Sequence, residues 1–343
     1  MKTRRNVARA IAGLIAAAVL AGAGTNAAAQ DAIRIGLQPS WAPASNIGKA
    51  LEVTNILEKN GLQGQFTSFI AGGPAIEAML ADKIDVILVG DAPAVILAAR
   101  GSPAKWVAKL QDYRGALLVR KDAPLAKLED IKGKNVAAFV SSGVYAQFYG
   151  WLTSIKLDPN KDIRLINLRP ADWIAALRRG EVDAVMAWDP IIAAGALEPD
   201  LRILHQAVSP APGVTIMNAG FIAKNRDAAV RFMAAYKEAV HFMANSGDEL
   251  MKRLSDENKM AIAAIKDAST YDGNFKNARA MKDVRVRFND PETRALQGIG
   301  ELLAELKQIK KAPDVRTVID ASLLDEAEKR MGANYDAKSV RLK

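Results

Sequence analysis

Residues 74–93 read PAIEAMLADKIDVILVGDAP, and residues 170–190 read PADWIAALRRGEVDAVMAWDP. Both stretches begin with Pro-Ala, continue with a helical pattern and turn into an apolar run that is typical of a buried strand. An Asp stands at the start of each predicted strand and another at its end: Asp85 and Asp91 in the first copy, Asp183 and Asp189 in the second. The repeat predicts two similar α/β lobes. Because ligands bind at the carboxyl ends of strands in open α/β sheets, we expect these two ends to face each other across a cleft.

The rest of the chain extends this pattern in both directions. Strand-like runs alternate with helical patterns of about ten residues, which is typical of crossover connections and predicts mainly parallel sheets. The predicted strands are 33–38, 65–71, 86–90, 105–112, 116–120, 135–140, 163–168, 182–188, 203–206 and 215–223. After Asn225 only helical patterns remain, at 227–245, 247–267, 291–310 and 323–330, and they predict a helical C-terminal tail.

The first 29 residues have the pattern of a secretory signal peptide. Lys2, Arg4, Arg5 and Arg9 precede an apolar run, residues 10–24, which is too short to span a bilayer as a membrane anchor would. Small residues then predict cleavage near Ala29-Gln30. Cleavage removes four basic residues and no acidic one, leaving 43 basic against 38 acidic residues, so the formal charge falls from +9 to +5. This modest charge, scattered along the chain, does not indicate nucleic-acid binding.

Composition narrows the class of protein further. Of 343 residues, half are hydrophobic and a quarter are charged, which is globular composition and excludes wholesale disorder. The chain has no Cys, which excludes disulfides, thiolate metal sites, thiol nucleophiles and a lipid-modified cysteine anchor. We therefore expect a free, monomeric periplasmic protein rather than a lipoprotein, with no cofactor and no metal site.

Two predicted turns at strand ends offer an anion site. Ser141-Ser142-Gly143 lies between a predicted strand and the helix that begins near Tyr145, and Gly72-Gly73 has the same arrangement after another strand. Hydroxyls, glycines and free N–H groups at a helix start make a cradle for an anion. Trp41, Tyr145 and Trp188 stand at the same predicted edges and are candidate walls for a small ligand. For Trp188 a purely structural role in the core remains an alternative.

The second Asp of each copy has two possible roles. Asp91 and Asp189 each precede a Pro by one or two residues, and Asp-Pro is good chemistry for capping a helix N-terminus. A capping Asp can also keep one oxygen free for a ligand amine or hydroxyl. We expect Asp189→Ala combined with Ser142→Ala to abolish stabilisation by ligand and to leave the ligand-free fold intact.

Four motifs together resemble one family. They are IRIGLQ (33–38), GGPAIEAMLADKIDVILVGDAP (72–93), LEDIKGKNVAAFVSSG (128–143) and RPADWIAALRRGEVDAVMAWDP (169–190). The chain is similar, over about residues 33–225, to the periplasmic substrate-binding proteins of ABC importers for nitrate, sulfonate and taurine. The resemblance implies a two-lobed type II periplasmic binding fold, a hinge of two crossovers and delivery of the ligand to an inner-membrane permease.

The resemblance also implies which residues line the site and how the chain is divided. In lobe one they are Gly72, Gly73, Gly90, Asp91 and Ala92; in lobe two they are Ser141, Ser142, Gly143, Trp188 and Asp189, with Asn218 on the returning strand. Trp41 departs from the small residues that the family has after its first strand. We expect residues 31–115 and 219–343 to form lobe one and residues 116–218 to form lobe two, with crossings near 112–117 and 215–220.

These expectations converge on a solute-binding protein rather than an enzyme. An anion cradle opposite two carboxylates favours a small organic anion or zwitterion, with a sulfonate or a taurine-like ligand ahead of nitrate, aromatic acids and pyrimidines. An enzyme on the same fold, of the pyrimidine-precursor or desulfination type, is the alternative from another class. The chain has no HExxH, GxSxG or P-loop motif, and its two histidines, His205 and His241, form no cluster.

Overall fold

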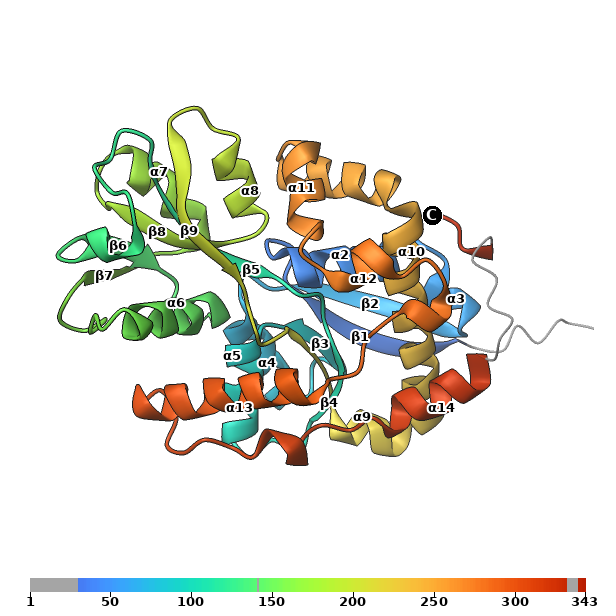
Figure 1. Cartoon of the computed structure of the whole chain (residues 1–343). Coiled ribbons are helices and arrows are strands. Elements are labelled where there is room, and N and C mark those ends of the chain that lie inside the picture. Colours follow the sequence, from blue (N-terminus) through green and yellow to red (C-terminus); the bar gives the residue numbers. More distant parts are fainter. Residues whose placement is uncertain (1–29, 141, 332–338) are drawn as a thin grey trace, which may run out of the picture.

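The structure is a computed structural model that describes residues 30–140, 142–331 and 339–343, and it forms two lobes (Figure 1). The predicted signal peptide and Ser141 lie outside the described residues. The sheet of lobe one has the order β2-β1-β3-β10-β4, with strands β1 (Asp31–Leu37), β2 (Leu62–Ser68), β3 (Val86–Val89), β4 (Lys105–Lys109) and β10 (Val214–Met217). The sheet of lobe two has the order β7-β6-β8-β5-β9, with strands β5 (Arg114–Arg120), β6 (Asn135–Ala138), β7 (Arg164–Asn167), β8 (Ala184–Trp188) and β9 (Leu201–Val208).

Both sheets are mixed rather than mainly parallel. The pairs β1–β2, β1–β3, β6–β7 and β6–β8 are parallel, whereas β10 runs antiparallel to β3 and β4, and β5 runs antiparallel to β8 and β9. The antiparallel pairs arise because the chain crosses between the lobes at the hinge. A strand that arrives from the other lobe enters at the edge where its neighbours end, as Val214 beside Val89 and Gly115 beside Trp188 show, so it must run the opposite way.

Two crossings connect the lobes, at residues 110–113 and 209–213. They are bonded to each other: Leu110 N–H donates to Gly213 O and Ser209 N–H donates to Tyr113 O, both at 2.8 Å. The second crossing comes earlier than expected. The run predicted as one strand, 215–223, is divided between β10 and helix α9 (Ala219–Lys224), so β10 belongs to the sheet of lobe one.

Helices cover both sheets. Lobe one carries α2 (Ala42–Val53), α3 (Ile56–Lys59), α4 (Gly72–Leu80), α5 (Asp91–Ala99) and α9; lobe two carries α6 (Gly143–Ser154), α7 (Trp173–Arg178) and α8 (Ile191–Ala196). Short 3₁₀ turns occur at Leu128–Ile131, Pro170–Asp172, Met281–Asp283 and Val315–Thr317. Within the described residues, no helix combines the length and the apolar character needed to cross a membrane.

The predicted helical tail is confirmed, with α10 (Arg226–Asn258), α11 (Ile262–Ser269), α12 (Gly273–Asn277), α13 (Asp290–Glu305) and α14 (Ser322–Met331). Helix α10 continues through Gly247, near which two helices were expected to meet, and the break before α11 comes instead at residues 259–261. A glycine costs a helix interior about 1 kcal/mol. Buried side chains on both sides of it, Met243 and Leu250, continue the apolar stripe of α10 and offset that cost. Figure 1 shows the tail running along lobe one and reaching lobe two through α11.

The repeat is structural as well as sequential. The Asp85 carboxylate accepts the N–H of Arg34 on β1 at 2.8 Å. In lobe two the Asp183 carboxylate accepts the N–H of Asn135 on β6 at 2.9 Å. Each first Asp therefore bonds the backbone of the neighbouring parallel strand in its own lobe, which confirms that the two lobes are built on one plan.

Candidate functional site

A pocket of about 30 Å³ lies between the lobes. It is lined by Gln38, Trp41, Ala71, Gly72, Gly90, Pro93, Tyr113, Phe139, Ser142, Gly143, Val144 and Trp188. These residues come from the carboxyl ends of β1, β2, β3, β6 and β8, from the helix starts that follow them and from the first crossing. A single water needs about 10–15 Å³, so the closed pocket accommodates a compact polar group, and a longer ligand requires more space between the lobes.

Four helices begin at this pocket, because Trp41 precedes α2, Gly72 opens α4, Gly90 precedes α5 and Gly143 opens α6. No side chain caps α4, whereas the Asp91 carboxylate accepts one N–H in the first turn of α5. On α6 the Ser142 hydroxyl accepts the N–H of Tyr145 at 3.3 Å and donates to Phe139 O at 2.6 Å. Each helix start favours a nearby anion by about 0.3–1 kcal/mol, and by up to ~2 kcal/mol when partly buried. Among the described lining residues there is no Lys or Arg, so the field here comes from backbone dipoles.

Aromatic rings form the walls. The ring centroids of Trp41 and Tyr113 lie 5.3 Å apart in an edge-on arrangement, and those of Phe139 and Trp188 lie 6.4 Å apart. Trp188 also packs on Trp173 at 4.6 Å, so it serves the core and lines the pocket at once. Its indole N–H donates to Ser40 O at 3.0 Å, which joins lobe two to lobe one.

Asp91 lies behind the cradle, at the interface of the lobes. It is fully buried, and its oxygens accept the Tyr113 hydroxyl at 2.8 Å and the N–H of Ala92 at 2.6 Å. Gly143 of lobe two lies directly against it, because a Cβ at residue 143 would overlap Asp91 Oδ1. The Asp91 carboxylate therefore makes its hydrogen bonds within the protein, and Asp91 is not among the residues that line the pocket.

The Asp189 carboxylate also makes its contacts within the protein. Its carboxylate pairs with the Arg114 guanidinium at 2.7 and 3.1 Å, with side chains 2% and 3% exposed, and also accepts the N–H of Ala193 at 3.2 Å. The expectation of two carboxylates opposite the cradle is therefore corrected. Arg114 supplies the positive partner that the sequence did not reveal, so a ligand amine is not needed to neutralise Asp189.

Asn218 lies at the wrong edge of the sheet for this pocket. Because β10 runs antiparallel to β3, its far end lies beside Asp85, whose carbonyl accepts the Asn218 N–H at 2.8 Å. The Asn218 side chain caps α9. At the other end of β10, Gly213 approaches the site: a Cβ there would come within 2.5 Å of the Trp41 ring.

The remaining predicted residues fall into two groups. Trp41, Gly72, Gly90, Ser142, Gly143 and Trp188 line the pocket, whereas Gly73, Ala92 and Tyr145 lie next to lining residues without lining it. Sequence reasoning missed Gln38, Phe139 and Tyr113. Gln38 and Phe139 each follow a strand directly, a position that the sequence could have flagged. Tyr113 lies on the crossing and carries no local signal.

Burial raises the pKa of the Asp91 carboxyl to about 6. Because the folded protein then holds this proton more tightly than the unfolded chain, we expect the contribution of Asp91 to the free energy of unfolding to fall as pH rises from about 4 to about 6. Asp91→Asn should remove this contribution. The contributions of Asp272, Asp189 and Glu238, whose pKa values burial also raises, should remain. Urea denaturation across this pH range measures the effect. Equal slopes in the two proteins would contradict the assignment to Asp91.

Two α/β lobes that close through two crossings around a pocket of helix N-termini define a binding protein that holds a small ligand between its lobes. Residues 53–268 match a family described as "ABC transporter, phosphonate, periplasmic substrate-binding protein". The chain belongs to this family. It is a periplasmic protein that takes a small-molecule ligand and works with a membrane permease, and the expected class is confirmed.

Individual relatives agree with this class. The chain is 27% identical over 319 residues to a protein of Bacillus subtilis (strain 168) assigned as an aliphatic sulfonates-binding protein, covering 90% of this chain and 93% of the relative. It is 24% identical to the taurine-binding periplasmic protein of Escherichia coli (strain K12), covering 67% and 72%. The aliphatic sulphonate binding protein SsuA from Escherichia coli has the same fold, with a TM-score of 0.71, 22% identity and coverage of 84% and 92%.

The fold is shared with an enzyme as well. A structure of the desulfurization enzyme DSZB matches with a TM-score of 0.63 at 12% identity, over 88% of this chain and 99% of that one, which shows the fold alone. The sequence relatives that match most of the chain are binding proteins. The chain is accordingly a binding protein and not an enzyme.

Proposed function

We propose that this protein binds an organic sulfonate whose tail carries no positive charge and delivers it to its permease. The observation that carries the proposal is the pocket itself, where the N-termini of α4, α5 and α6 meet aromatic walls and no charged side chain is among the described lining residues. The ligand contacts in this proposal come from Gln38, Trp41, Gly72, Gly90, Ser142, Gly143 and Trp188. Relatives assigned to aliphatic sulfonates support the same ligand class.

The charge of the ligand follows from the field of the cradle. Each helix start carries about half a positive charge. The Asp91 carboxylate at the start of α5 offsets part of that charge, so the remainder suits one negative charge better than two. A sulfonate is a fully ionised monoanion at neutral pH. An alkylphosphonate at this pH is largely a monoanion that keeps a P–OH proton, and the described lining offers that proton no free carboxylate as an acceptor. Nitrate is also a monoanion, but it has no tail to occupy the space between Trp41 and Trp188. A sulfonate with an apolar tail uses both features.

The absence of a free carboxylate among the described lining residues disfavours taurine. Its ammonium group would be desolvated between rings, because the oxygens of Asp91 and Asp189 are bonded within the protein. We therefore expect an uncharged tail to bind better than an aminoethyl tail, which revises the preference drawn from the sequence.

A calorimetric titration with matched ligands tests this proposal. We expect butanesulfonate to bind with a Kd near the micromolar range, about 8 kcal/mol. Taurine and butylphosphonate should bind at least about tenfold more weakly, a difference of about 1.4 kcal/mol. The butyl pair differs only in the anionic group, and taurine differs in the tail. A preference for taurine would contradict the assigned roles of Asp91 and Asp189, and a preference for butylphosphonate would contradict a cradle that has no acceptor for the P–OH proton.

We also propose that residues 1–29 are an export signal cleaved near Ala29-Gln30, that the mature protein is an unlipidated monomer, and that its lobes divide at the crossings, with residues 114–208 forming lobe two. The composition of the N-terminus and the lack of Cys support the first two parts. Intact-mass measurement of the periplasmic protein tests the cleavage, and a mass that retains the first 29 residues would contradict it. Light scattering tests the monomer.

A further inference from the structure

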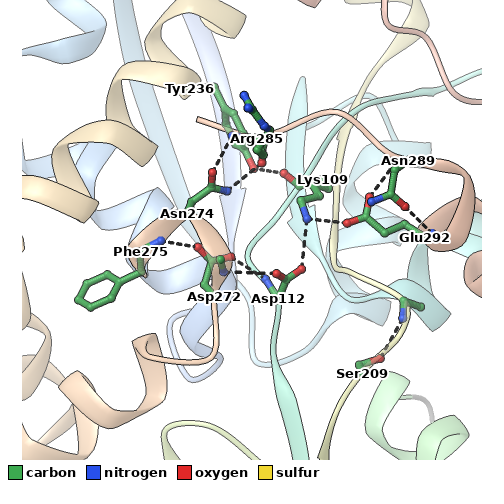
Figure 2. Close-up of polar contacts among 12 residues, drawn as sticks. Lys109, Asp112, Ser209, Tyr236, Asp272, Asn274, Phe275, Arg285, Asn289 and Glu292 are labelled. Carbon is green, nitrogen blue, oxygen red and sulfur yellow. Dashed lines mark hydrogen bonds and ion pairs between the residues drawn. The ribbon is translucent and has the colours of Figure 1, made fainter. Parts of the chain in front are cut away.

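The tail holds the first crossing from one side (Figure 2). The Lys109 ammonium, at the end of β4, bridges Asp112 of the crossing at 3.2 Å and Glu292 of α13 at 2.6 Å. The Asp112 N–H donates to the Asp272 carboxylate at 2.9 Å, and the Tyr236 hydroxyl donates to Lys109 O at 2.8 Å. Helices α10 and α13 and the start of α12 thus anchor the hinge to lobe one.

Arg114, the residue directly after the crossing, is shared between lobe two and the tail. On the lobe-two side it pairs with Asp189 and donates to Gln206 at 2.9 Å. On the tail side it pairs with Asp267 of α11 at 2.6 Å, and it bonds the Tyr271 hydroxyl while its guanidinium lies 4.1 Å from the centroid of the Tyr271 ring. The side chain is 3% exposed, so all of these contacts are made in a protected position.

Asp189 connects Arg114 to both tryptophan walls of the pocket. It follows Trp188 directly, and its carbonyl accepts the N–H of Ala42 at 3.0 Å, the residue after Trp41. Helix α11, which carries Asp267, packs on α8 of lobe two and on α2 of lobe one. Arg114 therefore connects the tail, through Asp267, to the segment of Asp189, where the Trp41 and Trp188 walls lie next to each other.

We propose that Arg114 is a positioning residue that latches lobe two to α11 through Asp267 and Tyr271, and so holds the Trp41 and Trp188 walls in their closed arrangement. This inference rests on the proposed function, because it concerns closure of the same site. Opening moves lobe two relative to the tail and releases the Asp267 contact into water, where a carboxylate that is already 48% exposed is readily solvated. The latch thus favours the closed form without touching the ligand.

Asp267→Asn tests the latch, with Asp248→Asn as its matched control. Asp248 pairs with Lys266 at 2.7 Å, an ion pair that lies wholly within the tail, and the two substitutions change the net charge equally. Because the chain has no Cys, Thr67→Cys on lobe one and Ala171→Cys on lobe two, both exposed, accept spin labels for distance measurement between the lobes.

We expect Asp267→Asn to lengthen the distance between the labels in the ligand-free protein and to weaken butanesulfonate binding by about threefold to tenfold, because the binding-competent closed population falls. Removing a negative charge would by itself strengthen anion binding. A weaker affinity for butanesulfonate therefore indicates loss of the latch, whereas a stronger affinity indicates a general electrostatic effect. Asp248→Asn should change neither quantity in this direction. Asp267→Glu should restore part of the label distance and part of the affinity. Tyr271→Phe should change both quantities in the same direction as Asp267→Asn, but less.

Equal label distances in Asp267→Asn and Asp248→Asn would overturn the latch. Unchanged thermal stability of Asp267→Asn without ligand is the check that the fold is intact. If butanesulfonate fails to bind the unaltered protein, the proposed ligand class fails, whereas the ligand-free distances still decide whether the latch exists.

Discussion

Gly143→Ala is expected to abolish ligand capture while leaving the ligand-free protein folded. A Cβ at residue 143 would overlap Asp91 Oδ1 and lie 2.7 Å from the Tyr113 hydroxyl oxygen. Gly143 belongs to lobe two and Asp91 to lobe one, so the overlap arises only when the lobes close. We expect an affinity for butanesulfonate at least about 100-fold weaker, corresponding to about 2.7 kcal/mol, measured by calorimetry.

Gly150→Ala on the same helix is the matched control. A Cβ at residue 150 meets nothing within 4 Å, so this variant should bind normally. It should also be more stable, by up to about 1 kcal/mol, because alanine favours a helix interior over glycine. Near-normal affinity in Gly143→Ala would show that the lobes close differently from the structure described above.

Asp189→Ala is expected to lower the free energy of unfolding by about 3–5 kcal/mol, because it leaves a buried guanidinium without its main partner. Arg114 is 3% exposed and would keep only Asp267, which is half-exposed, as an anionic partner. The expectation from the sequence, that Asp189→Ala leaves the ligand-free fold intact, is therefore revised. Urea denaturation of the ligand-free protein measures the change.

Asp172→Ala provides the comparison for that loss. Its carboxylate pairs with Arg169 at 3.2 Å, with side chains 46% and 75% exposed. Exposed pairs contribute little, so we expect a change within about 0.5 kcal/mol. If Asp189→Ala were as mild as Asp172→Ala, the buried ion pair would not be the stabilising contact that its geometry indicates.

The sequence was a good guide wherever function depends on local structure. The repeat predicted two lobes on one plan, and Asp85 and Asp183 play equivalent roles at the starts of β3 and β8. Gly72 and Gly143 were predicted to line the pocket because each stands where a strand ends and a helix begins, and adjacent residues are enough to mark such a junction. Gly90, which also lines it, was predicted from the family resemblance.

The sequence was a poor guide wherever function depends on which segments meet. Asp91 and Asp189 look alike in the repeat, yet one bonds Tyr113 and the other pairs with Arg114. These two partners are consecutive residues on the hinge, and no periodicity links them to the repeat. Asn218 was misplaced for a related reason, since its position depends on the direction in which β10 enters the sheet.

By itself, then, the sequence determined the α/β class, the repeated lobes, the helical tail and the helix starts that we propose as the anion cradle, because these follow from patterns over a few neighbouring residues. Only the tertiary structure decided that Asp91 and Asp189 are bonded to partners within the protein. It also decided that helix dipoles rather than charged side chains face the pocket, and that the tail contacts the hinge through Arg114. Those features depend on contacts across the crossings, where residues far apart in the chain become neighbours.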